Sequence, residues 1–275
     1  MVGQKSSSSW LKFIGLTLVL ILFIIPFIFV LINSFKENKA ITSNPLSLPA
    51  SLNFDNYLNA YEKMSFLTAF TNSLIITVLS VLFISLFAAM TAHYFVRHNT
   101  KINQYIFLLM VASMIIPFQA IMIPLVKIYG SINMLDSKWA LIYMYIGFGS
   151  SLAVFIYHGF VKGIPAELEE AAMIDGCTRI QTFFRIVFPV LLPTTVTIAI
   201  LNVLWIWNDF LLPSLVLVNQ EERTLPLSTY NFYGTYSVDF GPLMASLVLT
   251  ILPIIVIYLF AQKYIIQGVM QGSIK

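Results

Sequence analysis

The sequence is poor in cysteine and in charge. It has one cysteine, Cys177, and charged residues make up only 10% of its 275 residues. A single cysteine excludes an intrachain disulfide and a metal site built on a cysteine pair. The sequence also lacks the G-x-x-x-x-G-K-[ST] loop that cradles phosphate and the H-E-x-x-H zinc motif. We therefore expect a chain that is not an enzyme and has no metal or cofactor site of its own.

Hydrophobic residues make up 59% of the chain, and the mean hydropathy is +0.86. Soluble domains carry roughly 25% charged residues, far more than this chain. Six apolar runs reach the roughly 20 residues that a membrane-spanning helix needs. They lie at about 13–32, 70–95, 105–128, 139–160, 190–212 and 243–264. The sequence predicts an all-α polytopic membrane protein with six transmembrane helices, forming one domain over 1–275 in the cell membrane.

The placement of lysine and arginine predicts the orientation, because these residues are enriched on the cytoplasmic side of a membrane. With the N-terminus inside, the inner segments hold nine of them and the outer segments six. This bias places both termini and the loop 161–185 in the cytoplasm. The first run is longer than the roughly 7–15 apolar residues of a signal peptide, and no A-x-A site follows it, so we interpret it as a retained span.

Prolines fall within two of the apolar runs. Pro117 and Pro124 lie in the third run, which we expect to be kinked or interrupted. The stretch 186–218 is too long for one straight span. The prolines that divide it are Pro189, Pro193 and Pro213.

A polar stretch between the fourth and fifth runs predicts a short helix. Pro165 suits the first helical position, where a missing N–H costs nothing. Gly176 can adopt the left-handed conformation that ends a helix. Acidic residues fall in the first turns, where the helix dipole favours negative charge. These residues are Glu167, Glu169 and Glu170.

One face of this predicted helix carries mostly small side chains. Leu168, Ala171 and Ala172 share it at i, i+3 and i+4 spacing. Such a face permits close approach by a partner protein. The residues alone leave two interpretations open, namely a docking helix and a surface helix that only links two spans.

Four polar residues fall within or beside the predicted spans. Asp209 is an ionisable group in an apolar run, and such groups are costly in lipid and often functional. Pro213 follows soon after, so Asn208 and Asp209 either border a transport path or gate, or cap broken backbone. Asn202 and Gln119 either face a wet cavity or hydrogen-bond between helices.

The polar stretch also resembles a known motif. Glu170-Ala171-Ala172, followed by Gly176, Ile186 and Pro189, resembles the EAA loop in the membrane subunits of binding-protein-dependent ABC importers. That family usually has leucine where this chain has Phe188. Further segments resemble the carbohydrate branch of the family, the maltose-type inner permeases. They are Trp207-Asn208-Asp209-Phe210-Leu211 with Pro213, Thr224-Leu225-Pro226-Leu227, Phe240-Gly241, and the ending Gln262-Lys263-Tyr264 with Gly268 and Gly272-Ser273-Ile274-Lys275.

The resemblance implies a role and a set of partners. The chain would be a membrane subunit of an ATP-driven sugar importer, with an oligosaccharide as the expected cargo. Its partners would be a second, similar permease, two cytoplasmic ATPase subunits that bind ATP and Mg²⁺, an extracellular sugar-binding protein and the lipid bilayer, with no nucleic acid. The tail 268–275 would lie among the ATPase subunits.

The resemblance also implies roles for individual residues. The residues that would couple to the ATPase are Glu170, Ala171, Ala172, Asp175 and Gly176. The outer loop 219–242 would contact the binding protein. Its candidate contact residues are Tyr230, Tyr233 and Tyr236.

Two alternatives remain open at this point. An autonomous secondary carrier or channel would more often show charged pairs or interrupted helices in matched halves. An ABC permease for another solute, such as a peptide or an amino acid, would share the EAA loop but not the segment Trp207–Leu211 or the C-terminal pattern.

Overall fold

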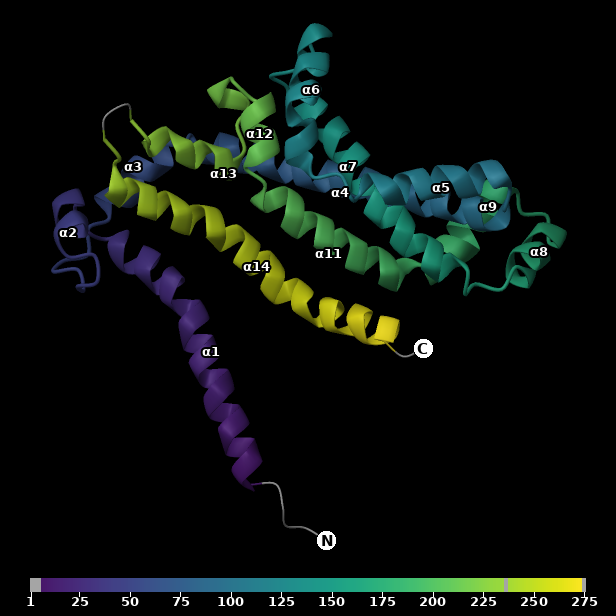
Figure 1. Ribbon diagram of the computed structural model, residues 1–275, viewed down its shortest axis with the longest axis horizontal. Coiled ribbons are helices and arrows are strands. Elements are labelled where there is room, and N and C mark those ends of the chain that lie inside the picture. Colours follow the sequence, from purple (N-terminus) through teal and green to yellow (C-terminus); the bar gives the residue numbers. More distant parts are fainter. Residues whose placement is uncertain (1–5, 235–236, 274–275) are drawn as a thin grey trace. The chain divides into compact units, whose positions relative to one another are not determined.

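The computed structural model describes residues 6–234 and 237–273. The regular secondary structure in these ranges is helical, apart from one isolated bridge between Tyr233 and Val238, and turns and irregular segments connect the helices. The chain divides into two compact units (Figure 1). One unit is formed by residues 1–66 and 229–253, and the other by residues 67–228 and 254–275. The predicted all-α class is confirmed.

The first unit begins with α1, a long apolar helix. Its helices are α1 (Ser6–Asn33), α2 (Asn38–Ser43), α3 (Asp55–Lys63), the short η3 (Thr229–Phe232) and the first part of α14 (Phe240–Ser273). No residue in the apolar 18-residue window of the span Trp10–Asn33 is buried by the rest of the described chain, whereas Asn33 at the end of the span is buried. Polar contacts hold the other elements together, since Asn38 accepts a hydrogen bond from the Gly241 N–H and donates one to Asp239.

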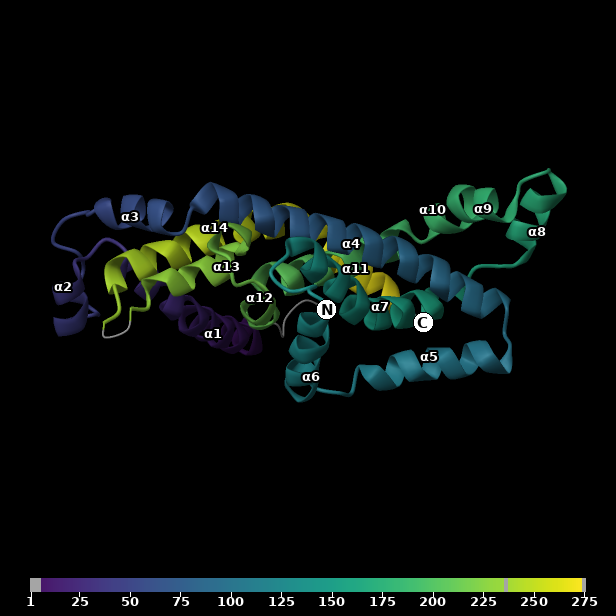
Figure 2. The same cartoon turned by 90° about the horizontal axis from the view of Figure 1, so that it is seen from above.

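The second unit is a bundle built around three long helices, α4, α7 and α11. Its helices are α4 (Phe66–Arg97), α5 (Lys101–Ser113), α6 (Phe118–Ser131), α7 (Lys138–Val161), α8 (Glu167–Ile174), α9 (Arg179–Thr182), the π-helix η1 (Phe183–Val187), α10 (Phe188–Val190), α11 (Leu192–Asn208), α12 (Leu211–Val216), the 3-10 helix η2 (Gln220–Glu222) and α13 (Leu225–Ser228). In both views α8 lies at one end of this unit, and α12 and α13 lie toward the other (Figures 1 and 2).

The three long helices come into close contact at Gly149 of α7. A Cβ atom built on Gly149 would lie 2.5 Å from the Ile84 Cδ1 of α4 and 2.9 Å from the Asn202 Oδ1 of α11. Real Cβ atoms do not approach other atoms this closely. A side chain at this position would therefore have to displace Ile84 or Asn202, and glycine avoids this, as in other membrane bundles with small residues at helix contacts.

The helices account for the six predicted apolar runs. Four helices are long and apolar enough to span a membrane, and two further pairs reach that length only together, each bent at a short break. The first pair, α5 and α6, is bent by 104°, which confirms the interruption predicted in the third run. The break falls at Pro117, in extended conformation before α6, whereas Pro124 lies inside α6. The second pair is bent by 75° at Leu191, between Pro189 and Pro193.

Candidate functional site

The predicted helix between the fourth and fifth runs is α8, and it begins at Glu167, later than predicted. Its N-cap is Ala166, so Pro165 precedes the cap instead of occupying the first helical position. Pro165 still stops any helical continuation from α7, because the residue before a proline is disfavoured in helical conformation. The three predicted acids do fall in the first turn of α8, where the helix dipole favours negative charge.

The end of α8 is fixed by Gly176, as predicted. Gly176 has φ of +89°, in the left-handed region. Its N–H bonds to the Met173 carbonyl at 3.1 Å, and the Cys177 N–H bonds to the Ala172 carbonyl at 3.0 Å. These two bonds form a Schellman motif, which satisfies carbonyls at the helix end. The chain then turns sharply into α9.

The faces of α8 differ from the prediction. Ala172 is only 8% exposed and lies on the inner face, so the predicted docking face of Leu168, Ala171 and Ala172 is wrong in its membership. The outward face carries instead a stripe at i, i+3, i+4 and i+7 spacing, which one side of a helix presents. This outward stripe consists of Glu167, Glu170, Ala171 and Ile174, all exposed, with Ile174 at 86%.

Glu169 joins Ala172 on the inner face and forms an ion cluster that the sequence analysis missed. Glu169 is 7% exposed, and both of its carboxylate oxygens are engaged. Oε1 accepts a hydrogen bond from Arg97 Nε at 2.8 Å and lies 2.6 Å from Arg97 Nη2. Oε2 lies 2.8 Å from His93 Nε2. The available signal was the spacing of His93 and Arg97, which at i and i+4 share one face at the end of α4.

Burial raises the pKa of the Glu169 carboxyl. The hydrogen bonds from Arg97 and His93 and the charges of both residues together lower this pKa by more than burial raises it, so the net pKa lies below its ordinary value. Glu169 is therefore ionised at neutral pH. Arg97 also donates to the Ile164 carbonyl at 2.9 Å, just before α8 begins. One arginine of α4 thus holds both α8 and its entry segment.

A cleft of about 680 Å³ lies among α5, α6, α7 and α11. Three of the four predicted path residues line it, namely Gln119, Asn202 and Asp209. Asn208 is not in its lining. Asn208 is exposed and donates to the Leu204 carbonyl of its own helix at 2.7 Å. The break at Pro117 turns the start of α6 toward this cleft, and Trp205 adds an aromatic wall.

Asp209 has the capping role that the sequence left open, and it also lines the cleft. Its Oδ1 accepts a hydrogen bond from the Leu211 N–H at 3.0 Å, which caps the start of α12 after α11 ends. Its Oδ2 accepts a hydrogen bond from the buried Tyr145 hydroxyl at 2.8 Å. The same side chain therefore caps broken backbone and forms part of the cleft wall.

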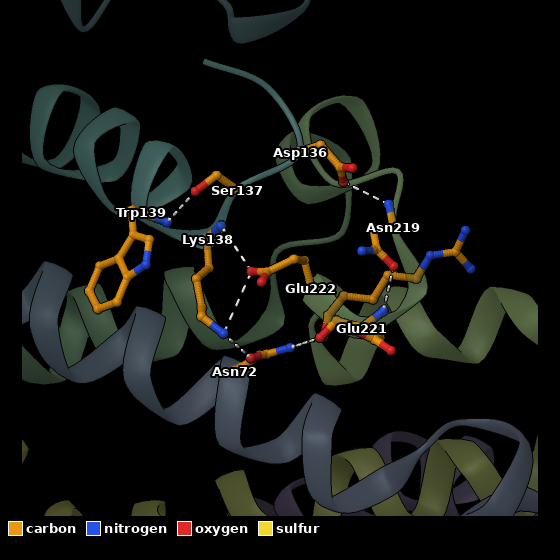
Figure 3. A network of polar contacts seen from close by, with 9 residues as sticks. Asn72, Asp136, Ser137, Lys138, Trp139, Asn219, Glu221 and Glu222 are labelled. Carbon is orange, nitrogen blue, oxygen red and sulfur yellow. Dashed lines mark hydrogen bonds and ion pairs between the residues drawn. The ribbon is translucent and has the colours of Figure 1, made fainter. Parts of the chain in front are cut away.

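A polar network ties the segment after α12 to the ends of α4 and α7 (Figure 3). Lys138 Nζ donates to Asn72 Oδ1 at 3.0 Å and lies 3.6 Å from Glu222 Oε2. Asn72 in turn donates to the Glu221 carbonyl at 2.7 Å. Asp136 Oδ1 accepts hydrogen bonds from the N–H groups of residues 218 and 219 at 2.8 and 2.6 Å.

The candidate contact tyrosines of the loop 219–242 are partly described. Tyr230 and Tyr233 are exposed, and their rings stack with centroids 5.5 Å apart. Tyr236 lies outside the described residues. The predicted tail 268–275 continues the backbone of α14 as far as Ser273, and residues 274 and 275 lie outside the described part.

Comparisons with known proteins decide the family. Residues 81–271 match the family of the binding-protein-dependent transport system inner membrane component. The chain belongs to this family. The match includes α8 and the cleft, and it confirms the resemblance drawn from the EAA loop. The chain is thus a transport permease located in a membrane.

Individual relatives extend the match over the whole chain. The probable starch degradation products transport system permease protein AmyC of Thermoanaerobacterium thermosulfurigenes is 45% identical over 265 residues, covering 96% of each chain. The multiple sugar-binding transport system permease protein MsmG of Streptococcus mutans serotype c is 36% identical over 276 residues, covering 99% of each. A bacterial ABC transporter involved in the import of the acidic polysaccharide alginate has the same fold, with a TM-score of 0.80, 20% identity and coverage of 96% of this chain and 99% of that one.

Proposed function

We propose that this permease carries oligosaccharides inward as one membrane subunit of an ATP-driven importer. The observation that supports this most directly is the 45% identity to the AmyC permease over nearly all of both chains. In this proposal a second permease completes the transport path, and an extracellular binding protein delivers the sugar. Two cytoplasmic ATPase subunits bind ATP and Mg²⁺, in keeping with the missing phosphate loop in this chain.

The outward stripe of α8 is the proposed contact with the ATPase. Ala171 lets a partner approach closely, Ile174 offers an apolar anchor, and Glu167 and Glu170 offer carboxylates to basic groups. Asp175 and Gly176 set the turn that follows. Ala172 acts indirectly, because it packs against the chain itself. This contact requires α8 to lie in the cytoplasm, together with both termini.

The cleft of about 680 Å³ is the proposed part of the transport path on this chain. Its volume lies in the range typical of small-ligand sites. Gln119, Asn202 and Asp209 supply polar groups, and Trp205 supplies an aromatic face suited to the apolar side of a sugar ring. Cysteines at these three polar positions, in a Cys177→Ser background, should react with a small aqueous thiol reagent in at least one transport state. A complete lack of reaction in every state would leave Asp209 as a structural cap only.

Uptake by the reconstituted complex tests the function. Proteoliposomes that hold this permease, its partner permease and the ATPase are supplied with the binding protein and with maltotriose, raffinose or arabinotriose. We expect uptake of at least one of them, dependent on internal ATP and on the binding protein. Uptake by this chain alone, driven by a proton gradient without ATP, would support an autonomous carrier instead. ATP-dependent uptake of peptides and of none of the sugars would contradict the proposed cargo.

Labelling of Cys177 tests the orientation. Cys177 directly follows α8 and is half-buried. In intact cells an impermeant thiol reagent should leave it unlabelled, and the same reagent should label it in inverted membrane vesicles. Labelling from outside the intact cell would overturn the proposed topology.

A further inference from the structure

We propose that the ion cluster of Glu169, Arg97 and His93 is the joint through which α8 moves α4, with Glu169 as the positioning residue. The inference rests on the proposed function, because it assigns a second face to the helix that contacts the ATPase. The outward stripe would receive the movement, and the inner face would transmit it to a long helix of the bundle.

The connections of α8 to its neighbours in sequence favour such a joint. α8 has only eight residues, and non-helical segments separate it from α7 and α9. A push on α8 therefore does not travel along a continuous helix. The direct polar route from α8 into the bundle runs from Glu169 to the last turn of α4, because both His93 and Arg97 belong to that helix.

The geometry of the cluster favours a rigid joint. Each carboxylate oxygen of Glu169 has its own partner on α4, so the carboxylate plane is fixed from two sides. Arg97 adds a bond to the Ile164 carbonyl and thereby fixes the segment before α8. The centroids of the His93 ring and the Phe183 ring lie 5.5 Å apart. Phe183 belongs to η1, so this contact links the cluster to the segment that follows α8 in sequence. Charge-assisted hydrogen bonds of this kind are shorter and stronger than neutral ones.

The joint and the outward stripe are separate sets of residues. At 100° per residue, Glu169 lies on nearly the opposite side of α8 from Ile174 and Glu167. A change at Glu169 should therefore affect transmission, whereas a change in the stripe should affect docking. This separation gives the two ideas different experimental signatures.

The test compares Glu169→Gln with Glu62→Gln, which removes an exposed acid of α3 that belongs to neither the ion cluster nor the outward stripe. Both are measured in the assembled importer for copurified ATPase, for ATP hydrolysis and for sugar uptake, at matched expression. We expect Glu169→Gln to keep the ATPase subunits and their hydrolysis but to reduce uptake about tenfold or more, equivalent to at least about 1.4 kcal/mol of coupling. Glu62→Gln should keep uptake within about twofold, equivalent to about 0.4 kcal/mol.

A charge exchange serves as the second variant. Glu169→Arg combined with Arg97→Glu restores an ion pair across the same contact. We expect it to recover uptake relative to either single change, and hydrogen exchange of the α8 amides to slow again in parallel. Normal uptake by Glu169→Gln would overturn the joint. Loss of the ATPase subunits from Glu169→Gln would also overturn it, since the cluster would then only fold the docking helix. Absence of ATP-dependent uptake by the unmodified complex would instead refute the proposed function.

Discussion

Replacing Gly149 by alanine tests whether the three central helices meet as the structure describes. The added Cβ would lie 2.5 Å from Ile84 Cδ1, 3.2 Å from Ile84 Cγ1 and 2.9 Å from Asn202 Oδ1. Ile84 is fully buried, so its side chain can move only by repacking against its neighbours. Overpacking of this kind costs about 1–3 kcal/mol. Alanine gains back up to about 1 kcal/mol of helix propensity, so a net loss of up to about 2 kcal/mol is expected.

The matched control is Gly147→Ala on the same helix, where an added Cβ meets nothing within 4 Å. It should be neutral or slightly stabilising. Thermal unfolding in detergent should therefore show a lower midpoint for Gly149→Ala, by about 2–4 °C for each kcal/mol lost. Ile84→Val removes the Cδ1 atom, so the double variant Gly149→Ala with Ile84→Val should recover part of the loss. If Gly149→Ala and Gly147→Ala unfold at the same temperature, the close contact of α4, α7 and α11 at Gly149 is wrong.

Three further changes test other parts of the chain. Gly176→Ala places a side chain at φ +89°, which should cost about 1–2 kcal/mol in backbone strain. We expect this variant to take up less sugar than the unmodified permease at equal expression. Equal uptake would mean that the Schellman turn is not needed for coupling to the ATPase. The lowered pKa of Glu169 means that its stabilising contribution is complete above the ordinary carboxyl pKa of about 4.3 and is lost as the pH falls through the lowered folded-state value. The protection factors of the α8 amides, which compare each exchange rate with the intrinsic rate at the same pH, should thus fall only below about pH 4, and a fall near pH 6 would contradict this. Glu222→Gln should lower the free energy of unfolding by at most about 1 kcal/mol, because the ion pair of Glu222 with Lys138 is partly exposed. A loss above about 3 kcal/mol in thermal unfolding would contradict this and mean that the pair is far more buried.

The sequence was sufficient for features that depend on local chemistry. Hydrophobic run length located the long helices, and the conformational freedom of Gly176 located the end of α8. The interruption of the third run was also predicted, but not which proline causes it. Pro117 lies where the chain is extended between two helices, whereas Pro124 lies within α6. Whether a proline breaks a helix or lies within it depends here on how the neighbouring helices pack, which the proline alone does not show.

The sequence was insufficient where a side chain's partner lies far along the chain. The spacing of Leu168, Ala171 and Ala172 permits a shared face, but the rotation of α8 about its axis is set by its partners on α4, about seventy residues earlier. Glu169 fixes that rotation, because its burial with Arg97 turns Ala172 inward and Ile174 outward. The sequence explained Glu169 only by its favourable interaction with the helix dipole in the first turn of α8. That interaction does not depend on the rotation of α8 about its axis.

For Asp209, one of the proposed path residues, the capping role and the proposed path role do not exclude each other. A carboxylate in an apolar environment needs hydrogen-bond donors to remain there. The Leu211 N–H and the Tyr145 hydroxyl supply them, and the first is available only because α11 breaks at this point. The broken backbone therefore stabilises the acid, and the acid caps the broken backbone. The capping bonds hold Asp209 at the wall of the cleft, so the cap is compatible with the proposed transport role and does not replace it.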